Sequence, residues 1–380
     1  MLQNIKEKLR RHIFGHRLLV FMQKIHIWLK FLKRIQSRRI QLLKQSILRK
    51  SNLPSTIQLP ITYKCNFNCV MCGMHNLIGQ KDFNSEELRT ILKDKLYSRV
   101  TAVGINGGEP FLKTDLLDCI NAIVNMLPSL KSLNIISNGF FTDKIISQLT
   151  EIKKLCKLKS IKVNLSLSVD GVKDMQDFMR GHKDAFTHVN QTIQAIQSRQ
   201  NELCDSLGII CTLTRHNITR INEVEIWAES TGVNVSYNIA TINRRIDNFD
   251  KFEHFSIFTD QKALFLAREF FYKLFLKTDS EKYFAIFLYL LTRKRYAPCE
   301  HLECSGVTLT PDMQLGYCAT YSKNLGNAYL ESSYKIFKGN KKHLRELERK
   351  FCGGCSHYIY NLSPSGLKLF RDEKIRRMIT

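Results

Sequence analysis

The chain has 380 residues, 44% of them hydrophobic and 24% charged, which is the composition of an ordinary soluble globular protein with room for a large domain and a smaller one. Its 12 cysteines are too dilute for a small disulfide scaffold, and its longest apolar run, Tyr283 to Leu291, is too short to span a bilayer. The formal charge is +24 and no secretory signal is visible, so we expect a cytoplasmic protein with reduced thiols.

The first 50 residues are the most basic part of the chain, with 14 Lys and Arg side chains against one acid, Glu7. Apolar residues recur there at helical spacing and basic residues lie elsewhere on the wheel; the apolar set is Leu18, Phe21, Ile25, Trp28, Leu32 and Ile35. We therefore expect a basic amphipathic helical extension that an anionic membrane surface would attract, placing the protein peripherally on the inner face of the membrane. The alternative is that this helix packs on its own domain with a solvated basic face. Binding to nucleic acid is the less favoured use of the basic segment, because no recognisable nucleic-acid module accompanies it.

After Leu53-Pro54, short β-rich runs alternate with helical patterns. Six strands are predicted, at 56–62, 100–106, 132–136, 161–168, 208–214 and 234–239. Helices are predicted between them, at 85–97, 114–127, 142–155, 186–199 and 220–231. Six such units favour an α/β fold with a partial (β/α)6 TIM-like barrel over a doubly wound sheet. In both folds, chemistry belongs at the carboxyl ends of the strands.

Cys65, Cys69 and Cys72 form a C-x3-C-x2-C run directly after the first predicted strand. Three thiolates can hold three irons of a [4Fe–4S] cluster and leave the fourth iron open to a substrate or cosubstrate. Structural zinc sites more often show two separated pairs of ligands, so the spacing favours iron and sulfur. The remaining alternative is that the spacing arose by chance, and motifs elsewhere in the chain distinguish the two.

Polar residues also follow the next strands. The segment 106–110 contains two glycines, which let backbone approach a ligand closely, and Glu109, which can accept hydrogen bonds from a cationic group. The third strand is followed by 137–139 and the fourth ends in 166–171, with Arg180 soon after. Each segment alone is typical of an ordinary turn. Together they predict a polar rim around the cysteine loop.

In these motifs the chain resembles the radical S-adenosylmethionine (SAM) superfamily, over roughly residues 55–240. The cysteine run after the first strand and Gly107-Gly108-Glu109-Pro110 after the second match its two best-known signatures in order and position. The resemblance implies a partial (β/α)6 barrel whose [4Fe–4S] cluster, on Cys65, Cys69 and Cys72, binds SAM at the open iron. The SAM-binding residues that it implies are Met71, Gly107, Gly108, Glu109, Pro110, Asn138, Ser168, Asp170 and Arg180.

Roles for some of these residues follow from the same resemblance. Glu109 and its neighbours would receive the methionine amino group of SAM, while Ser168 and Arg180 would help to hold its carboxylate. Met71 stands where the family often has an aromatic residue near the adenine, and methionine is a soft contact that could substitute. The implied reaction is reductive cleavage of SAM to a 5′-deoxyadenosyl radical, with an external reductant such as flavodoxin or ferredoxin.

Five further cysteines have the spacing C-x4-C-x13-C-x33-C-x2-C, which resembles the SPASM and Twitch extensions of radical SAM enzymes. No cysteine follows the last of them, so the shorter Twitch form is the better match. It implies a second, auxiliary [4Fe–4S] cluster, with structural zinc as the alternative. Its expected ligands are Cys304, Cys318, Cys352 and Cys355, with Cys299 able to replace one of them. The remaining cysteines are predicted to be buried small hydrophobic residues: Cys119, Cys156, Cys204 and Cys211.

The predicted domains are a basic extension, a barrel, a helical bridge, a cluster domain and a basic tail, at 1–52, 53–245, 246–296, 297–360 and 361–380. We expect an enzyme that oxidises or modifies a sugar, glycan-type or other small molecule, and no catalytic acid or base stands out. A maturase of a peptide or protein is the alternative, although the first 50 residues are too short and helical for a winged-helix recognition module. A hypothesis of another class is a non-catalytic iron–sulfur or zinc protein recruited by its basic arm.

Overall fold

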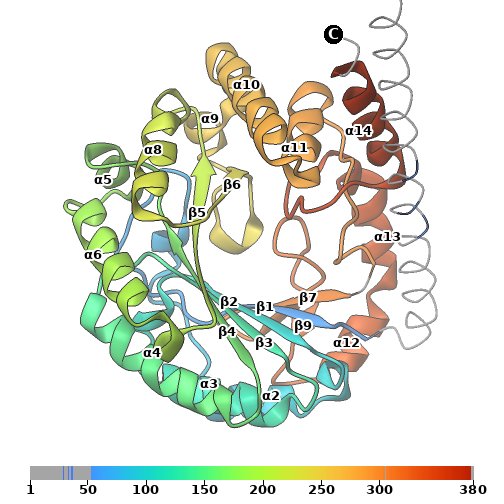
Figure 1. The fold of residues 1–380 in the computed structure, drawn as a ribbon. Coiled ribbons are helices and arrows are strands. Elements are labelled where there is room, and N and C mark those ends of the chain that lie inside the picture. Colours follow the sequence, from blue (N-terminus) through green and yellow to red (C-terminus); the bar gives the residue numbers. More distant parts are fainter. Residues whose placement is uncertain (1–28, 30–32, 34–35, 37–52, 304, 378–380) are drawn as a thin grey trace, which may run out of the picture. The chain divides into compact units, whose positions relative to one another are not determined.

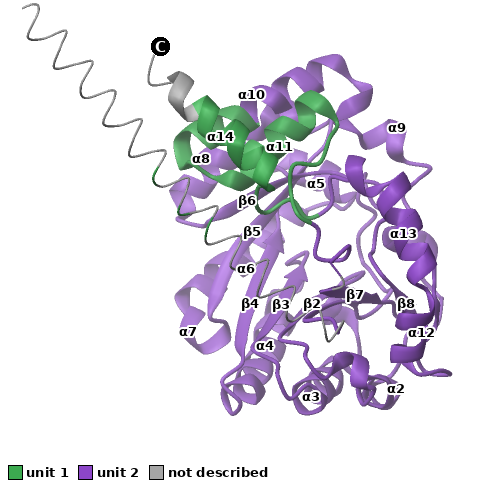
Figure 2. Ribbon diagram, turned by 90° about the vertical axis from the view of Figure 1, so that its right-hand side faces the viewer, with its two compact units in different colours: residues 1–51, 271–298, 358–380 green, residues 52–270, 299–357 purple. Residues whose placement is uncertain are grey.

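The computed structural model describes residues 29, 33, 36, 53–303 and 305–377, which fall into two compact units (Figures 1 and 2). Unit 1 comprises residues 1–51, 271–298 and 358–380, and unit 2 comprises residues 52–270 and 299–357. The basic helix predicted for residues 1–52 lies outside the described residues except at Leu29, Lys33 and Gln36, so it stays a prediction.

Unit 2 is built on one open sheet of nine strands (Figure 1). Six of them run parallel in the order β6-β5-β4-β3-β2-β1. Their bounds are Thr56–Pro60 (β1), Ala102–Asn106 (β2), Ser132–Ser137 (β3), Lys162–Ser168 (β4), Ser206–Leu213 (β5) and Val235–Ile239 (β6). Each strand lies beside the next one in sequence, as expected for a partial barrel. The predicted α/β partial-barrel fold is confirmed.

The sheet continues beyond β1 with strands from much later in the chain. β7 (Gly306–Leu309) pairs parallel with β1, and Thr56 lies opposite Gly306. β8 (Gln314–Gly316) and β9 (Gly326–Asn327) then follow antiparallel. Because β7 runs in the same direction as β1, the turn after it reaches the edge of the sheet where the cysteine loop begins.

The helices of the barrel follow the strands and lie along its outer side in Figure 1. They are α2 (Ser85–Leu92), α3 (Leu116–Met126), α4 (Thr142–Lys157), α5 (Asp174–Arg180), α6 (Ala185–Ser198), α7 (Gln200–Leu203) and α8 (Ile221–Thr231). The helix predicted at 85–97 is two elements. The Asp94 side chain accepts a hydrogen bond from the Leu96 backbone N–H at 2.8 Å and so starts a separate 3-10 turn, η3 (Lys95–Tyr97). Helix α5 had no counterpart among the predicted elements.

The core of unit 2 lies between the sheet and these helices. Along β4, Val163, Leu165 and Leu167 are buried while the residues between them are partly exposed, which is the alternation of a strand with one apolar face. Four cysteines are at most 1% exposed, as predicted for small core residues: Cys119, Cys156, Cys204 and Cys211. The C-terminal part of unit 2 adds α12 (Ser333–Gly339), α13 (Lys341–Lys350) and the 3-10 turn η8 (Cys352–Gly354). Before α10 the barrel part also contains α9 (Phe252–Phe255).

Unit 1 is helical where it is described. It contains the end of α10 (Gln261–Thr278), α11 (Glu281–Thr292) and α14 (Pro364–Arg377). The ring of Phe275 packs against those of Phe284 and Phe370, with ring centroids 4.7 and 5.3 Å apart. Among the helices of the described residues, none combines the length and hydropathy needed to cross a membrane.

Candidate active site

Two loops at the carboxyl ends of β1 and β2 are joined by backbone hydrogen bonds. The N–H of Ile61 donates to the Asn106 carbonyl at 2.7 Å, and the N–H of Gly108 donates to the Thr62 carbonyl at 2.8 Å. The N–H of Glu109 donates to the Lys64 carbonyl, also at 2.8 Å. The pairing of β1 with β2 therefore continues past both strands. It holds the segment containing Glu109 directly beside the start of the cysteine loop.

This pairing depends on glycine at position 108. A Cβ added to Gly108 would lie 2.0 Å from the Lys64 carbonyl oxygen, which is backbone and cannot turn away. We expect Gly108→Ala to lower the free energy of unfolding by at least about 2 kcal/mol and to reduce iron incorporation, because the cysteine loop must shift. Chemical denaturation and iron analysis measure both effects. Gly339→Ala is the matched control, since its Cβ would meet nothing within 4 Å; equal behaviour of the two variants would contradict the prediction.

The three predicted iron ligands gather in the loop after β1. The N–H of Cys72 donates to the Cys69 carbonyl at 3.0 Å, and the N–H of Met74 donates to the Cys72 sulfur at 3.4 Å. The pKa of the Cys65 thiol is raised to about 12 and that of Cys69 to about 11, chiefly by burial and in smaller part by nearby cysteine thiols. Burial also raises the pKa of Cys72. The three sulfurs are thus close enough to interact electrostatically.

The donor set suits an iron–sulfur cluster. Three soft thiol ligands lie in one short loop, and no imidazole or carboxylate intervenes between them in the sequence. Within the described part of the chain, no three His, Cys, Asp or Glu side chains stand in a geometry already assembled for a metal ion. Binding of a cluster would displace the thiol protons, which couples metal binding to pH.

Glu109 is buried at the base of this loop, with 1% of its surface exposed. One carboxylate oxygen accepts from the Ser137 hydroxyl at 2.8 Å, and the other accepts from the Asn138 backbone N–H at 2.7 Å. Burial raises the pKa of Glu109 to about 7, although these hydrogen bonds oppose the rise. The Asn138 side chain in turn donates to Asn66, inside the cysteine loop, at 2.8 Å. The predicted residues Glu109 and Asn138 therefore do come together beside the cysteines.

Asp170 and Arg180 form a buried ion pair on another side of the loop. Their closest nitrogen and oxygen are 2.7 Å apart, and a second guanidinium nitrogen of Arg180 lies 3.7 Å from the Cys69 sulfur. Burial raises the pKa of Asp170, and the Arg180 guanidinium opposes that rise. Gly181, which ends α5 at φ +60°, allows the close approach: a Cβ there would lie 2.2 Å from the Asn68 carbonyl oxygen. Helix α5 thus fixes a positive charge next to the cysteine loop.

The other predicted SAM contacts have structural surroundings of their own. Met71 is 9% exposed and packs against Met179 and Phe255, and its carbonyl accepts from the Asn248 side chain at 2.8 Å. Pro110 begins the 3-10 turn η4 (Pro110–Leu112) that Glu109 caps. Ser168 ends β4, and its carbonyl accepts from the Gln176 side chain at 3.0 Å. These contacts are all within the protein, so the roles of the three residues toward SAM stay predictions.

Several residues that support the loop were not found from the sequence. The Lys251 ammonium donates to the Cys72 carbonyl at 2.8 Å, and the Asn217 amide donates to the Asp170 carbonyl at 2.8 Å. The Arg245 guanidinium donates to the Asn106 side chain at 2.9 Å. Each partner pair is separated by 47 to 179 residues, so no local pattern could have indicated the contact.

The C-terminal cysteines are described only in part. Cys304 lies outside the described residues, so its predicted role cannot be placed. Burial raises the pKa of Cys318, while backbone N–H groups of the three residues 320–322 donate to its sulfur and oppose the rise. Cys299 also raises the pKa of Cys318, which indicates that the two lie within electrostatic reach. Cys352 and Cys355 share the turn η8, where the Cys355 N–H donates to the Cys352 carbonyl at 3.4 Å.

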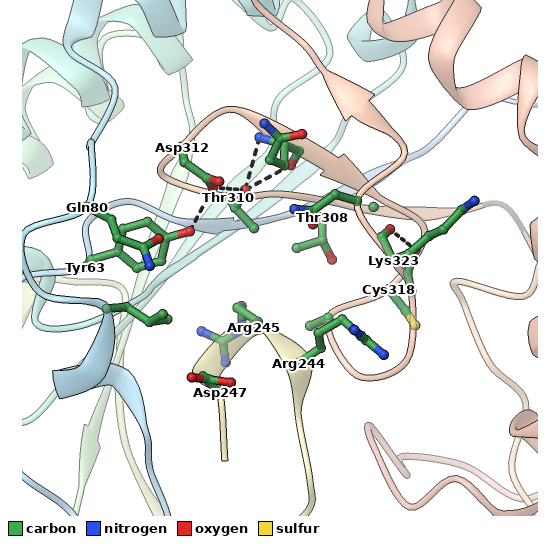
Figure 3. A pocket seen from close by; sticks show the side chains of 16 residues that line it. Tyr63, Gln80, Arg244, Arg245, Asp247, Thr308, Thr310, Asp312, Cys318 and Lys323 are labelled. Atoms are coloured by element: carbon green, nitrogen blue, oxygen red, sulfur yellow. Dashed lines mark hydrogen bonds between the residues drawn. The ribbon is translucent and has the colours of Figure 1, made fainter. Parts of the chain in front are cut away.

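A cavity of about 520 Å³ in unit 2 lies next to Cys318 (Figure 3). It is bordered by the start of the cysteine loop, the turn η6 (Arg244–Ile246) after β6, and the β7–β8 hairpin. Tyr63 and Asp312 lie at one end in Figure 3, and Arg244 and Cys318 lie at the other. Most of the side chains that line it are polar or charged. A cavity of this size and polarity fits a small hydrophilic molecule.

Comparison with known proteins shows which family the barrel part of the chain is similar to. Residues 59–228 match the model of the radical SAM superfamily. A probable GTP 3′,8-cyclase from Sulfurisphaera tokodaii is 24% identical over 181 residues, which are 47% of this chain and 53% of that protein. Another, from Methanococcus aeolicus, is 29% identical over 99 residues, 25% of this chain and 33% of that protein. The chain therefore spans about half, or less, of the length of these relatives.

Solved structures resemble a larger part of the chain. anSMEcpe with bound AdoMet (S-adenosylmethionine) has a TM-score of 0.57 at 16% identity, and the match covers 86% of this chain and 94% of that one. Streptococcus suis SuiB bound to the precursor peptide SuiA has a TM-score of 0.56 at 13% identity, covering 81% and 70%. At such low identity, the likeness concerns the fold.

Proposed function

We propose that this chain, a member of the radical SAM superfamily of enzymes through residues 59–228, cleaves SAM reductively and takes hydrogen from a substrate C–H bond. A [4Fe–4S] cluster, when bound, supplies the electron for this cleavage and an open iron for SAM. One observation carries the proposal: backbone hydrogen bonds hold the Gly107-Gly108-Glu109 segment against the loop of three cysteines. These are the two motifs that the reaction requires in one place.

The side chains around the loop take distinct roles in this proposal. Cys65, Cys69 and Cys72 hold the cluster. Glu109 accepts hydrogen bonds from the SAM amino group, because its ionised carboxylate is anchored by Ser137 and Asn138 at a fixed position. The positive charge of the amino group would favour ionised Glu109 and offset the cost of burying it.

The carboxylate of SAM requires donors, and two are proposed. Arg180 has a guanidinium held by Asp170 and lies within reach of the Cys69 sulfur, so its charge is fixed close to the cluster loop. Ser168, at the end of the neighbouring strand β4, is the second. Asn138 braces the cysteine loop through Asn66. Met71 is the proposed contact to the adenine, where its thioether can adapt to an aromatic ring.

An auxiliary cluster is proposed for the C-terminal cysteines. Cys318 is suited to be a ligand, because backbone N–H groups surround its sulfur and stabilise the thiolate. Cys352 and Cys355 come from a single turn, and Cys299 lies within electrostatic reach of Cys318. With Cys304, these residues supply enough thiols for a [4Fe–4S] cluster. Zinc is the alternative occupant, and metal analysis separates the two.

Metal content gives a direct check of the two-cluster proposal. We expect the anaerobically reconstituted chain to contain about eight irons, and Cys318→Ala to contain about four. Cys156→Ala is the matched control, since Cys156 is a buried core residue, and it should keep about eight. Electron paramagnetic resonance of each reduced sample should change on addition of SAM in all three proteins. Zinc in place of half the iron would contradict an auxiliary cluster, and a spectrum indifferent to SAM would contradict the SAM site.

The substrate is proposed to be a sugar, a glycan-type molecule or another small polar molecule. The polar lining of the cavity beside Cys318 supports this choice, because an apolar side chain would find few partners there. The curated relatives named as probable GTP 3′,8-cyclases favour a small molecule as well. A peptide is the second candidate, favoured by the structural likeness to SuiB bound to a precursor peptide. A one-electron donor such as flavodoxin or ferredoxin is the proposed partner.

A further inference from the structure

The cavity next to Cys318 is lined by both positive and negative side chains. Three cations line it, Arg244, Arg245 and Lys323, together with two carboxylates, those of Asp247 and Asp312. We propose that this cavity binds an oxyanion of the substrate, a phosphate or a carboxylate, at Arg244, and a hydroxyl or amino group at Asp312. This inference rests on the proposed function for the reaction itself, and it adds the chemical class of the substrate.

The two arginines are held in place by their backbone. They begin the 3-10 turn η6, where the Asn243 side chain accepts a hydrogen bond from the Arg245 N–H at 2.9 Å. The N–H groups of Arg244 and Arg245 donate to the carbonyls of Thr320 and Ala319, each at 3.1 Å. The turn is thereby fastened to the loop that follows Cys318. A guanidinium group on a fixed backbone is suited to bind an oxyanion through two parallel hydrogen bonds.

The charge of Arg244 is available to a ligand. Among residues 53–303 and 305–377, no carboxylate lies within ion-pair distance of its guanidinium, which stands 5.7 Å from the Phe249 ring centroid. Arg245 donates to the uncharged side chain of Asn106 at 2.9 Å, and this bond orients its guanidinium. An anion that enters the cavity at the Cys318 end therefore meets Arg244 as its principal cation.

The opposite end of the cavity would repel an anion. Asp312 accepts hydrogen bonds from the Tyr63 hydroxyl at 2.7 Å and from the Thr310 hydroxyl at 2.5 Å. A carboxylate fixed in this way accepts a hydrogen bond from a hydroxyl or ammonium group of a ligand, and it repels an oxyanion. The substrate would consequently bind in one orientation, with its anionic end toward Arg244 and Cys318 (Figure 3).

A competing explanation is that Arg244 only offsets the negative charge of a cluster held by Cys318. The two explanations differ in what Arg244→Gln changes. If Arg244 is only a charge partner of the cluster, its loss would shift the reduction potential of that cluster and leave the binding of small anions unchanged. Loss of a substrate contact would weaken the binding of small anions.

The test uses three molecules with similar three-carbon skeletons: glycerol 3-phosphate, glycerate and neutral glycerol. Their binding to the reconstituted full chain is measured by ligand-observed saturation-transfer NMR. We expect at least one of the two anions to bind and glycerol to give no signal. Arg244→Gln should weaken that binding by at least about tenfold, because a charge-assisted contact is lost. Preference for glycerol 3-phosphate over glycerate would identify the oxyanion as phosphate, and the reverse preference would identify a carboxylate.

Control variants and a second assay distinguish a failure of anion binding from a failure of SAM cleavage. Arg199→Gln removes an exposed arginine that does not line the cavity and should bind the anions like the unaltered chain. If Arg244→Gln does not fold, Arg244→Lys, which keeps the charge without the planar fork, should show a severalfold loss. Binding that survives both changes, or a shifted reduction potential with unchanged anion binding, would overturn the inference. SAM cleavage without substrate is assayed on the unaltered chain and on Arg199→Gln, and it should be equal in the two; its absence from the unaltered chain would contradict the proposed function alone.

Discussion

Cys69→Ala is expected to reduce SAM cleavage by at least about three orders of magnitude. The two remaining thiols cannot hold a cluster that needs three ligated irons and one open iron. Cys69 is the central cysteine of the loop, and its sulfur lies 3.7 Å from the Arg180 guanidinium. The variant therefore loses both an iron ligand and the contact that places Arg180. Iron content should fall by about four per chain while the auxiliary cluster persists. Liquid chromatography of 5′-deoxyadenosine and colorimetric iron analysis measure the two effects.

The control for this variant is Cys156→Ala, which also removes one thiol. Cys156 lies in α4, fully buried among apolar side chains. Its replacement should cost some stability through the small cavity left behind and keep SAM cleavage near that of the unaltered chain. A Cys69→Ala protein that cleaves SAM as fast as Cys156→Ala would rule out the assigned cluster site.

Glu109→Gln is expected to weaken SAM binding by at least about tenfold and to remove its pH dependence. Burial raises the pKa of Glu109 to about 7, so the carboxylate is largely protonated at pH 6 and ionised at pH 8. In the proposed site, the SAM amino group binds the ionised form of Glu109. Below pH 7 the affinity for SAM should therefore fall by up to about tenfold for each unit of pH. Isothermal titration calorimetry between pH 6 and 8 measures both effects.

The same raised pKa affects stability in a defined direction. An unfolded glutamate ionises near pH 4.3, whereas Glu109 in the fold stays protonated up to about pH 7. Its contribution to the free energy of unfolding is thus complete at low pH and is lost as the pH rises through this window. Glu86→Gln, at an exposed position of α2, is the control and should change neither SAM binding nor its pH dependence. Unaltered SAM affinity in Glu109→Gln would contradict the role given to this residue.

The strands were predictable because the local pattern and the tertiary structure agree. The six barrel strands begin and end within two residues of their predicted bounds, since alternating or continuous apolar residues mark each of them. The helix predicted at 85–97 was too long because Asp94 bonds to a nearby backbone N–H and ends the helical pattern. Helix α5 is short and capped by Gly181, and its sequence has no strong apolar periodicity.

The predictability of the site follows the same logic. The cysteine run and Gly107-Gly108-Glu109-Pro110 follow consecutive parallel strands. Because the carboxyl ends of such strands lie at the same edge of the sheet, the sequence predicts that the two motifs are close together. Tyr63 and Asp312 are 249 residues apart and meet because β7 pairs with β1, which the sequence does not indicate. Arg245 reaches Asn106 across 139 residues for a similar reason. The juxtaposition of the two loops proposed to bind the cofactors could therefore be predicted, whereas the cavity proposed for the substrate could not.

The most direct test of the account is anaerobic cleavage of SAM by the reconstituted full-length chain under dithionite. We expect 5′-deoxyadenosine and methionine in equal amounts, formed only when iron, sulfide, SAM and reductant are all present. A protein that carries its full content of iron and sulfide, and whose cysteines are intact, but forms no 5′-deoxyadenosine would contradict it. That result would instead favour a non-catalytic iron–sulfur protein.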